Sequence, residues 1–346
     1  MKHRHKHGRG ERGASKSRSK LIALCIVIVL LLLLAYQGGR WLEEQNNKPE
    51  ARGDYTERRY ASENIIDVDG VSYAKRRGIT SILVMGVDRD SGTEISATDF
   101  RNGGQADFLR LIVIDNASHK IDQMQIDRDT MTPITILGVL GNKSGVRTAQ
   151  ISLSHGFGDG AEYSCQLTED AVSNLLLGTD IDFYISMNLD GISALNDVAG
   201  GVTVTLEDDF SMIDPEMTQG RQITLVGDQA EIYVRSRMSM EVGTNEARMV
   251  RQQNYISQLV SQLNEKIRAD RSYINTMYDA IEPYIITDMN RGRLINEIWA
   301  ARDYERDALV ELEGTHRVGS DGFMQFYADE SSVQQAVLSL FYEKVE

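Results

Sequence analysis

Three apolar runs within residues 81–130 constrain the fold more than any other part of this 346-residue chain. Residues 82–87, 109–114 and 121–126 have the length and apolar composition of strands, and each has a charged residue at one end. Only the polar residues 115–120 separate the second run from the third. Because this is the length of a hairpin loop, we expect these two strands to pair antiparallel.

This pairing predicts where three charged residues meet. Asp107 precedes the second run and Arg128 follows the third, so the hairpin places both at one edge of the sheet. If the first run lies parallel to the third, Asp88 at its end reaches the same edge. Two carboxylates and a guanidinium would then converge where loops shape a pocket. Strands also end in charged residues simply because their ends are solvated, and this stretch alone leaves both interpretations open.

The chain beyond residue 160 alternates between helix and strand signals. A capping threonine, early acids and a final glycine predict a helix over residues 167–178. Strand patterns at 182–187 and 202–206 enclose a second helix, residues 189–199, that ends at two glycines. No spacer separates the last eighty residues from this domain. The alternation predicts an α/β fold, a three-layer α-β-α sandwich with a mixed central sheet.

An unbroken apolar run, residues 21–36, predicts one N-terminal transmembrane helix. The run is short for the roughly 20 residues that span a bilayer, but neutral residues extend it. Residues 1–20 have a net charge of +7, which leaves −21 for the rest, so the positive-inside rule puts this tail in the cytoplasm. A cleaved signal peptide fits less well, because no good cleavage site follows the run. We therefore expect a single-pass protein of the cell membrane, with a stalk over residues 37–62 and an extracytoplasmic domain over residues 63–346.

Five cationic or amide groups gather in the second half of the chain. Arg235 and Arg237 are two residues apart, so in an extended segment they share one face. Arg248, Arg251 and Gln252 have the i, i+3, i+4 spacing of one face of a helix. In an acidic protein this arrangement indicates a site for a multiply charged anion such as phosphate, whose oxygens suit the arginine fork. A salt-bridge network with the many carboxylates is the alternative, and the residues alone do not decide between them.

Two residues with reactive side chains have no obvious partner. His155 lies beside a glycine-rich turn, where a lone histidine more often forms a local hydrogen bond than takes part in catalysis. Cys165 is the only cysteine outside the apolar run, so we expect no disulfide framework.

Taken together, the ordered motifs resemble the LytR-CpsA-Psr family of membrane-anchored bacterial envelope enzymes, over roughly residues 63–270. No single motif is decisive, but the ordered set is highly specific. The motifs are Ile82-Leu-Val-Met-Gly-Val-Asp88-Arg, Asp107 before a strand, Ile126-Asp-Arg128-Asp-Thr130, Leu177-Gly-Thr-Asp-Ile-Asp-Phe-Tyr184, Asn196-Asp-Val-Ala-Gly-Gly-Val202, Tyr233-Val-Arg-Ser-Arg237 and Arg248-Met-Val-Arg-Gln-Gln253.

The resemblance implies a glycopolymer–peptidoglycan phosphotransferase. Such an enzyme moves a teichoic acid or capsular polysaccharide from an undecaprenyl pyrophosphate carrier to peptidoglycan at the cell membrane, with no nucleic-acid partner. Breaking a pyrophosphate requires charge neutralisation more than a covalent nucleophile, which an arginine cluster with Mg²⁺ or Mn²⁺ supplies. By resemblance, the metal ligands are Asp88 and Asp107, the catalytic residues are Arg128 and Arg235, and the substrate-binding residues are Arg237, Arg248 and Gln252.

Four departures from the family pattern bear on activity. Gln105 stands in place of an arginine, Asp127 in place of a proline, and Gln150 in place of a lysine. Asn245 stands in place of an acidic residue, although the adjacent residue in this chain, Glu246, is acidic. They keep two alternatives open beside the transferase. One is a non-catalytic module that binds lipid phosphate or regulates the envelope, and the other is a polyprenyl pyrophosphatase.

Overall fold

The computed structural model describes residues 65–89, 103–138, 140–236 and 245–345, with the side chains of 245–247 left out. All of these residues belong to one compact unit, residues 55–346. The expected basic tail, anchor and stalk lie outside the described residues. Within the described part, none of the helices combines the length and the apolarity that crossing a bilayer requires.

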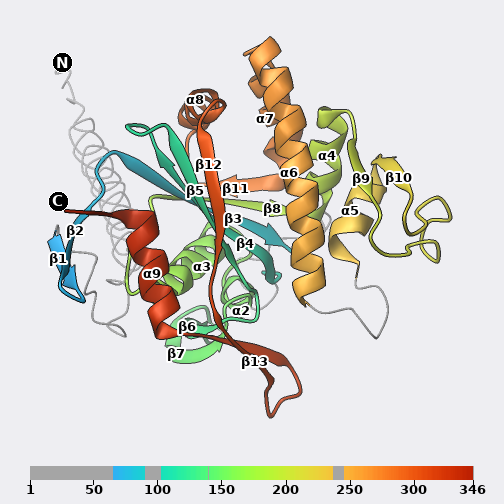
Figure 1. The fold of residues 1–346 in the computed structure, drawn as a ribbon. Helices are drawn as coiled ribbons and strands as arrows, with labels where there is room; N and C mark the ends of the chain where they lie inside the picture. Colours follow the sequence, from blue (N-terminus) through green and yellow to red (C-terminus); the bar gives the residue numbers. More distant parts are fainter. Residues whose placement is uncertain (1–64, 90–102, 139, 237–244, 346) are drawn as a thin grey trace, which may run out of the picture. The chain divides into compact units, whose positions relative to one another are not determined.

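A six-stranded mixed sheet forms the centre of the fold (Figure 1). The expected hairpin is present, and the strand before it runs parallel to the hairpin's second strand. Two further parallel pairs and one antiparallel pair complete the sheet. The prediction of a mixed α/β fold with a mixed central sheet is therefore confirmed. The strand order is β11 (Ile285–Thr287), β8 (Phe183–Asn188), β3 (Ile79–Val87), β4 (Ala106–Asp115), β5 (Lys120–Ile126) and β12 (Glu305–Glu311).

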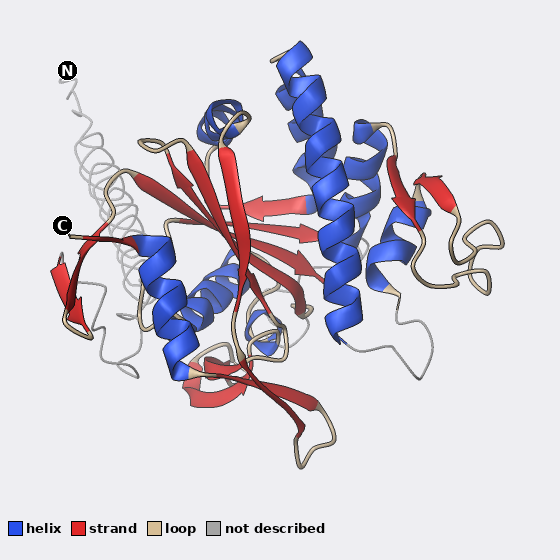
Figure 2. Cartoon of the chain, viewed as in Figure 1, coloured by secondary structure: helices blue, strands red, loops and turns tan. Residues whose placement is uncertain are grey.

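Helices cover both faces of this sheet (Figure 2). Side chains that alternate along β3 and β4, such as Leu83 and Leu111, pack against α3 (Glu162–Leu175) and α9 (Glu330–Phe341) on one face. The intervening side chains, such as Ile82 and Ile114, face α7 (Tyr273–Ile281) and α8 (Arg291–Ala301). Burying one such side chain contributes about 1.5–3 kcal/mol, so the sheet's edge positions are held by a rigid, two-sided core.

Cap chemistry sets the helix boundaries. Helix α4 (Leu189–Ala199) has the predicted bounds, because Asn188 accepts the Gly191 N–H at its start and Gly200 adopts φ 86° at its end. Helix α3 begins five residues before the predicted start. There the carboxylate of Asp159 accepts the N–H groups of Ala161 and Ser164, which caps the helix earlier than the threonine does.

A second core lies beside the main sheet, where the long helix α6 (Asn245–Ala269) packs against several shorter elements. Arg235 ends helix α5, so the expected extended segment through Arg235 is wrong. Buried Ala230, Tyr233 and Val234 and the Arg235 pair with Glu231 favour helix there. Arg237 lies outside the described residues. The neighbours of α6 are α4, α5 (Asp228–Arg235), β9 (Val202–Thr205) and β10 (Gln222–Leu225).

The C-terminal region packs on the same domain, as expected, but joins it in ways that local patterns do not show. β12 becomes an edge strand of the central sheet, parallel to β5. Two antiparallel hairpins lie next to one another beyond the C-terminal end of β5. A β-bridge between Thr130 and Phe326 connects them. The strands of these hairpins are β6 (Met131–Leu137), β7 (Lys143–Gln150), β13 (Gly314–Val318) and β14 (Met324–Ala328). The other described elements of the domain are α2 (Leu153–Gly156), η1 (Glu282–Tyr284), β1 (Ile65–Val68), β2 (Val71–Lys75) and β15 (Tyr342–Lys344).

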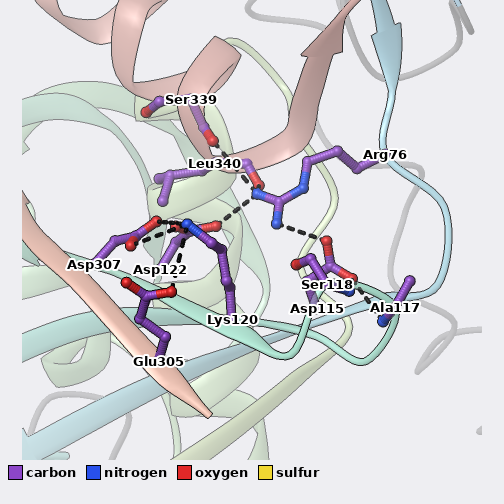
Figure 3. Close-up of polar contacts among 10 residues, drawn as sticks. All are labelled: Arg76, Asp115, Ala117, Ser118, Lys120, Asp122, Glu305, Asp307, Ser339 and Leu340. Carbon is purple, nitrogen blue, oxygen red and sulfur yellow. Dashed lines mark hydrogen bonds and ion pairs between the residues drawn. The ribbon is translucent and has the colours of Figure 1, made fainter.

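Arg76 joins three distant segments at the end of the sheet where β4 passes into β5 (Figure 3). Its guanidinium contacts Asp122 at 2.6 Å and Asp115 at 2.9 Å, and it donates to the carbonyl oxygens of Ser339 and Leu340 at the end of α9. We call these five residues the Arg76 cluster. It ties the segment between β2 and β3 to the β4–β5 end of the central sheet and to the last helix.

Candidate functional site

Asp107 of β4 lies between two guanidinium groups. Its Oδ1 is 2.5 Å from Nη1 of Arg128, and its Oδ2 is 3.5 Å from Nη1 of Arg248. Arg128 follows β5, whereas Arg248 comes from the first turns of α6, more than a hundred residues later. The side chains of Asp107, Arg128 and Arg248 are 22%, 12% and 6% exposed. A single carboxylate thus holds two half-buried or buried cations in place, and we call these three residues the Asp107 cluster.

Asp88 and Arg235 form a second ion pair at the end of β3. Arg235 Nη2 lies 2.8 Å from Asp88 Oδ1, and its Nη1 lies 3.2 Å from Glu231. Burial would lower the pKa of Arg235, but the nearby Asp88 and Glu231 carboxylates outweigh it and raise that pKa. The two side chains of the pair are 50% and 42% exposed, so this part of the site faces solvent.

The backbone brings Asp88 and Asp107 to the same edge of the sheet. The Asp88 N–H donates to the carbonyl oxygen of Gln105 at 2.9 Å, and the β3–β4 register shifts between Gly86 and Val87. That shift inserts Asp107 as an extra residue within β4, where the sequence suggested a position just before the strand. Together with Arg128 after β5, the charged groups expected at one edge do lie there.

At this edge, Arg128 and Arg89 each keep a buried donor that has no hydrogen-bond acceptor among the described residues. Arg128 Nη2 donates to Gln105, and its Nε stays 3.7 Å from Asp129 without a hydrogen bond. Arg89 donates to the carbonyl oxygen of Gly160 at 2.6 Å, and its Nε is likewise buried and unmatched among the described residues. A buried donor left unmatched costs about 1–3 kcal/mol, so both nitrogens are suited to an oxygen-rich ligand.

Two residues of the predicted anion face turn toward the protein. Arg251 pairs with Asp208 and donates to the carbonyl oxygens of Ser236 and Tyr233. Its role is to fasten α6 to the end of α5, so the network interpretation holds for Arg251. The Gln252 side chain donates to the carbonyl oxygen of Val234 at 3.3 Å, and its substrate-binding role stays a prediction.

Sequence reasoning missed two arginines near the site. Arg89 directly follows Asp88, and its position beside a motif acid was the available signal. Arg110 interrupts the apolar run of β4, and it is buried with its donors on the side-chain oxygens of Gln125 and Gln253. Burial lowers the pKa of Arg110 to about 10, so the group stays charged at neutral pH. A charged residue inside the apolar pattern of a strand was the signal that could have identified Arg110.

His155 has a structural environment, as expected for a lone histidine. The ring is buried, with Nδ1 3.2 Å from the carbonyl oxygen of Gly104 and Nε2 3.9 Å from the Cys165 sulfur. Burial lowers the pKa of His155 to about 4 and raises that of Cys165 to about 12. At neutral pH both groups are therefore uncharged. The contact of His155 with the Gly104 carbonyl oxygen holds the segment that leads into β4.

The carboxylates at the edge have the chemistry that Mg²⁺ requires. Among the described residues, no three or more metal-binding side chains gather in one place. Magnesium commonly uses only one or two carboxylates and takes its other ligands from substrate phosphates and water. Asp88 and Asp107 match that donor set, although each is paired with arginine here. A metal ion would therefore compete with Arg235 and Arg128 for these oxygens.

Comparisons with known proteins agree with the motifs and the fold. A polyisoprenyl-teichoic acid–peptidoglycan teichoic acid transferase TagU from Halalkalibacterium halodurans is 26% identical over 77% of this chain and 75% of its own length. The cell wall biosynthesis protein LcpA from Corynebacterium glutamicum is 30% identical over 61% of this chain and 45% of its own length. The crystal structure of gbs0355 from Streptococcus agalactiae shares the fold, with a TM-score of 0.61 and 23% identity over 75% of this chain and 87% of that one.

The profile of the LytR_cpsA_psr family matches residues 44–339. The match covers most of the chain, including every strand of the central sheet and both ion-pair groups at its edge. It confirms the resemblance that the ordered motifs carry. The chain therefore belongs to the LytR_cpsA_psr family.

Proposed function

We propose that this protein is a membrane-anchored phosphotransferase that moves a glycopolymer from an undecaprenyl pyrophosphate carrier to peptidoglycan. The observation that carries the proposal is the Asp107 cluster, in which one carboxylate positions the guanidinium groups of Arg128 and Arg248. A relative is named as a teichoic acid transferase to peptidoglycan, and another as a cell wall biosynthesis protein, which supports an anionic glycopolymer as the transferred group.

The reaction joins a peptidoglycan sugar to the polymer through a phosphodiester. The acceptor hydroxyl oxygen attacks the phosphorus that bears the glycan, the bond to the bridging oxygen breaks, and polyprenyl phosphate leaves with the electron pair of that bond. The hydroxyl proton passes to the departing phosphate. Arg128 and Arg235, with Arg237 and Arg248, neutralise the charge that develops on the phosphate oxygens. Because the arginine fork contacts two oxygens at once, the cluster also orients the diphosphate.

Asp88 and Asp107 are the residues that would hold Mg²⁺ or Mn²⁺. Bound there, the ion supplies further positive charge to the diphosphate. The protein's own part is to keep the two carboxylates on adjacent strands, which the hydrogen bond from Asp88 N to the Gln105 oxygen fixes. A carrier embedded in the bilayer also requires the site to lie outside the cytoplasm near the membrane, as the apolar run at residues 21–36 predicts.

One observation favours a second candidate, a module that binds the lipid phosphate without turnover. Gln105, which replaces a family arginine, accepts a hydrogen bond from Arg128, and Asp107 and Asp129 lie against the same guanidinium. Arg128 is thus partly occupied by protein acceptors. In this alternative the site holds its ligand but lacks the cation that completes charge neutralisation.

The test uses the full chain in detergent with a synthetic polyprenyl-pyrophosphoryl sugar and a peptidoglycan oligosaccharide as acceptor. Transfer should require a divalent ion and should be lost in Asp88→Ala. Asp303→Asn, in an exposed ion pair with Arg268, is the matched control and should retain full activity. Transfer that survives Asp88→Ala and chelation would show the metal assignment to be wrong.

The same assay separates the alternatives. Release of polyprenyl phosphate that does not depend on the acceptor identifies a pyrophosphatase. Binding of the lipid without any release identifies the non-catalytic module. Either outcome overturns the transferase proposal while leaving the fold and the position of the Asp107 cluster unaffected.

A further inference from the structure

We propose that the β13–β14 hairpin braces the turn that carries Arg128, and that His316 is the positioning residue of this brace. The turn, residues 127–130, connects β5 to β6 and places the Arg128 side chain on Asp107. The hairpin comes from the C-terminal region, almost 190 residues later. The role of Arg128 in this inference rests on the proposed function, whereas the brace itself does not.

The hairpin contacts the turn directly through His316 and Phe326, and indirectly through Gln150 of β7. His316 Nε2 lies 2.9 Å from Oδ2 of Asp127, and the backbone N–H of Phe326 donates to the carbonyl oxygen of Asp129 at 2.8 Å. Gln150 of β7 donates both to Asp129 Oδ1 at 3.1 Å and to the carbonyl oxygen of Met324 at 2.6 Å. Both residues flanking Arg128 are therefore fastened to the hairpin.

His316 contacts a side chain that organises the turn from within, that of Asp127. Asp127 is 8% exposed; its Oδ1 accepts the Asp129 N–H at 2.8 Å, and its carbonyl oxygen accepts both the N–H and the hydroxyl of Thr130. With one carboxylate oxygen on the turn's own backbone and the other on the imidazole, the orientation of Asp127 is fixed on two sides. The His316 ring is in turn packed on Phe326, with ring centroids 4.6 Å apart.

The brace controls how precisely the Arg128 side chain is positioned. Arg128 stabilises charge only if its fork stays within about 0.5 Å of the position from which it hydrogen-bonds the phosphate oxygens, and a turn between two strands has little rigidity of its own. His316 contacts Asp127, the residue directly before Arg128. It acts through Asp127 on the backbone conformation at residue 128, which makes it a positioning residue for the transfer reaction.

The experiment compares three variants of the full chain. His316→Ala removes the contact to Asp127, and His316→Gln keeps an N–H donor at nearly the same reach. Arg317→Ala is the control on the same strand, since its guanidinium stacks on Tyr327 of the hairpin instead of meeting the turn. Hydrogen exchange of peptides covering residues 127–130 measures the brace directly, and kcat and KM for polyprenyl-pyrophosphoryl sugar transfer measure its effect.

We expect His316→Ala to raise exchange at the Asp129 and Thr130 amides at least fivefold and to lower kcat about tenfold with little change in KM. His316→Gln should restore both within about threefold, and Arg317→Ala should match the wild type. Unchanged exchange in His316→Ala, or equal damage in His316→Gln, overturns the brace. Raised exchange with wild-type kcat overturns the positioning role. A wild-type chain without turnover refutes the proposed function instead, and the exchange result still decides the brace.

Discussion

Two arginine-carboxylate clusters lie at opposite ends of the β4–β5 strand pair and differ in their ratio of carboxylates to guanidinium groups. In the Arg76 cluster, one guanidinium is shared by Asp115 and Asp122 and also serves two helix carbonyls. Residues 107 and 115 of β4 are eight apart, so this cluster lies about 26 Å along the strand from Asp107. Its three charged side chains are only 11–13% exposed.

The Asp107 cluster has the opposite ratio, with one carboxylate held between Arg128 and Arg248. Among the described residues, the buried Nε atoms of Arg128 and of the nearby Arg89 have no hydrogen-bond acceptor, whereas Arg76 has four acceptors on its two terminal nitrogens. The same residue types therefore perform different work. A guanidinium that is shared by two carboxylates stabilises the fold, and two guanidinium groups that share one carboxylate are suited to an anionic ligand.

The largest expected effect of this difference is on activity. Arg128→Ala should lower kcat/KM for transfer at least 100-fold, because it removes a charged donor aimed at developing negative charge. The thermal midpoint should fall less than in Arg76→Ala, since Asp107 keeps its second guanidinium partner, Arg248. Arg268→Ala, in an exposed pair with Asp303, serves as the control. Steady-state kinetics and a thermal melt of the same preparation provide the measurement, and a melt that falls together with activity would contradict the division of roles.

Arg76→Ala should show the reverse pattern. Removing this cation leaves two largely buried carboxylates unpaired, which we expect to lower the free energy of unfolding by about 3 kcal/mol. Below the lowered midpoint, kcat/KM should remain within twofold of the wild type. Urea titration measures the first quantity, and the transfer assay at 15 °C measures the second. A strong loss of activity in folded Arg76→Ala would merge the two clusters into one functional unit.

The site end of the sheet also contains a group that should make stability sensitive to acid. His155 keeps a pKa of about 4 in the folded chain because it is buried, against an ordinary value of 6.5. The unfolded chain thus binds a proton first, so this contribution to stability is complete above pH 6.5 and is lost as pH falls toward 4. Over that window the loss is about 3 kcal/mol. Unfolding free energies at pH 7 and pH 5 measure it, and a His155→Gln chain with an equally steep pH dependence would refute the assignment.

The Arg76 end should respond at lower pH and by a smaller amount. Burial alone would raise the pKa of Asp115, but hydrogen bonds from Arg76 and from the turn at Ser118 and Ala117 lower it to about 2. This stabilisation is present above pH 3.8 and is lost as pH falls toward 2, by about 2 kcal/mol in total. Asp115→Asn should flatten the stability curve between pH 4.5 and 3 relative to Asp303→Asn. Parallel curves for the two variants would contradict it.

The sequence predicted those features that depend on neighbours along the chain. The pairing of β4 with β5 follows from a six-residue loop between apolar runs, and it places Asp107 and Arg128 at one edge. The bounds of α4 follow from its caps. Arg248 could not be placed in this way, because its contact with Asp107 depends on how α6 packs across the sheet.

Features set by contacts between distant segments were missed for the same reason. The β13–β14 hairpin reaches the Arg128 turn through His316 and Phe326, and no local pattern specifies that approach. The extended segment expected at Arg235 is helical because its buried side chains pack against α6. Local periodicity identified the groups with the right chemistry, and only the tertiary packing shows which of them share a carboxylate.

The most direct test of the account is the affinity of a short, soluble prenyl diphosphate for the full chain, measured by isothermal titration in the presence of Mg²⁺. Arg128→Ala should raise the Kd at least tenfold, in line with the loss of a charged hydrogen bond, and Arg76→Ala should leave the Kd unchanged. Equal affinity of Arg128→Ala and the wild type, or a comparable loss in Arg76→Ala, would contradict the claim that the diphosphate binds at the Asp107 cluster.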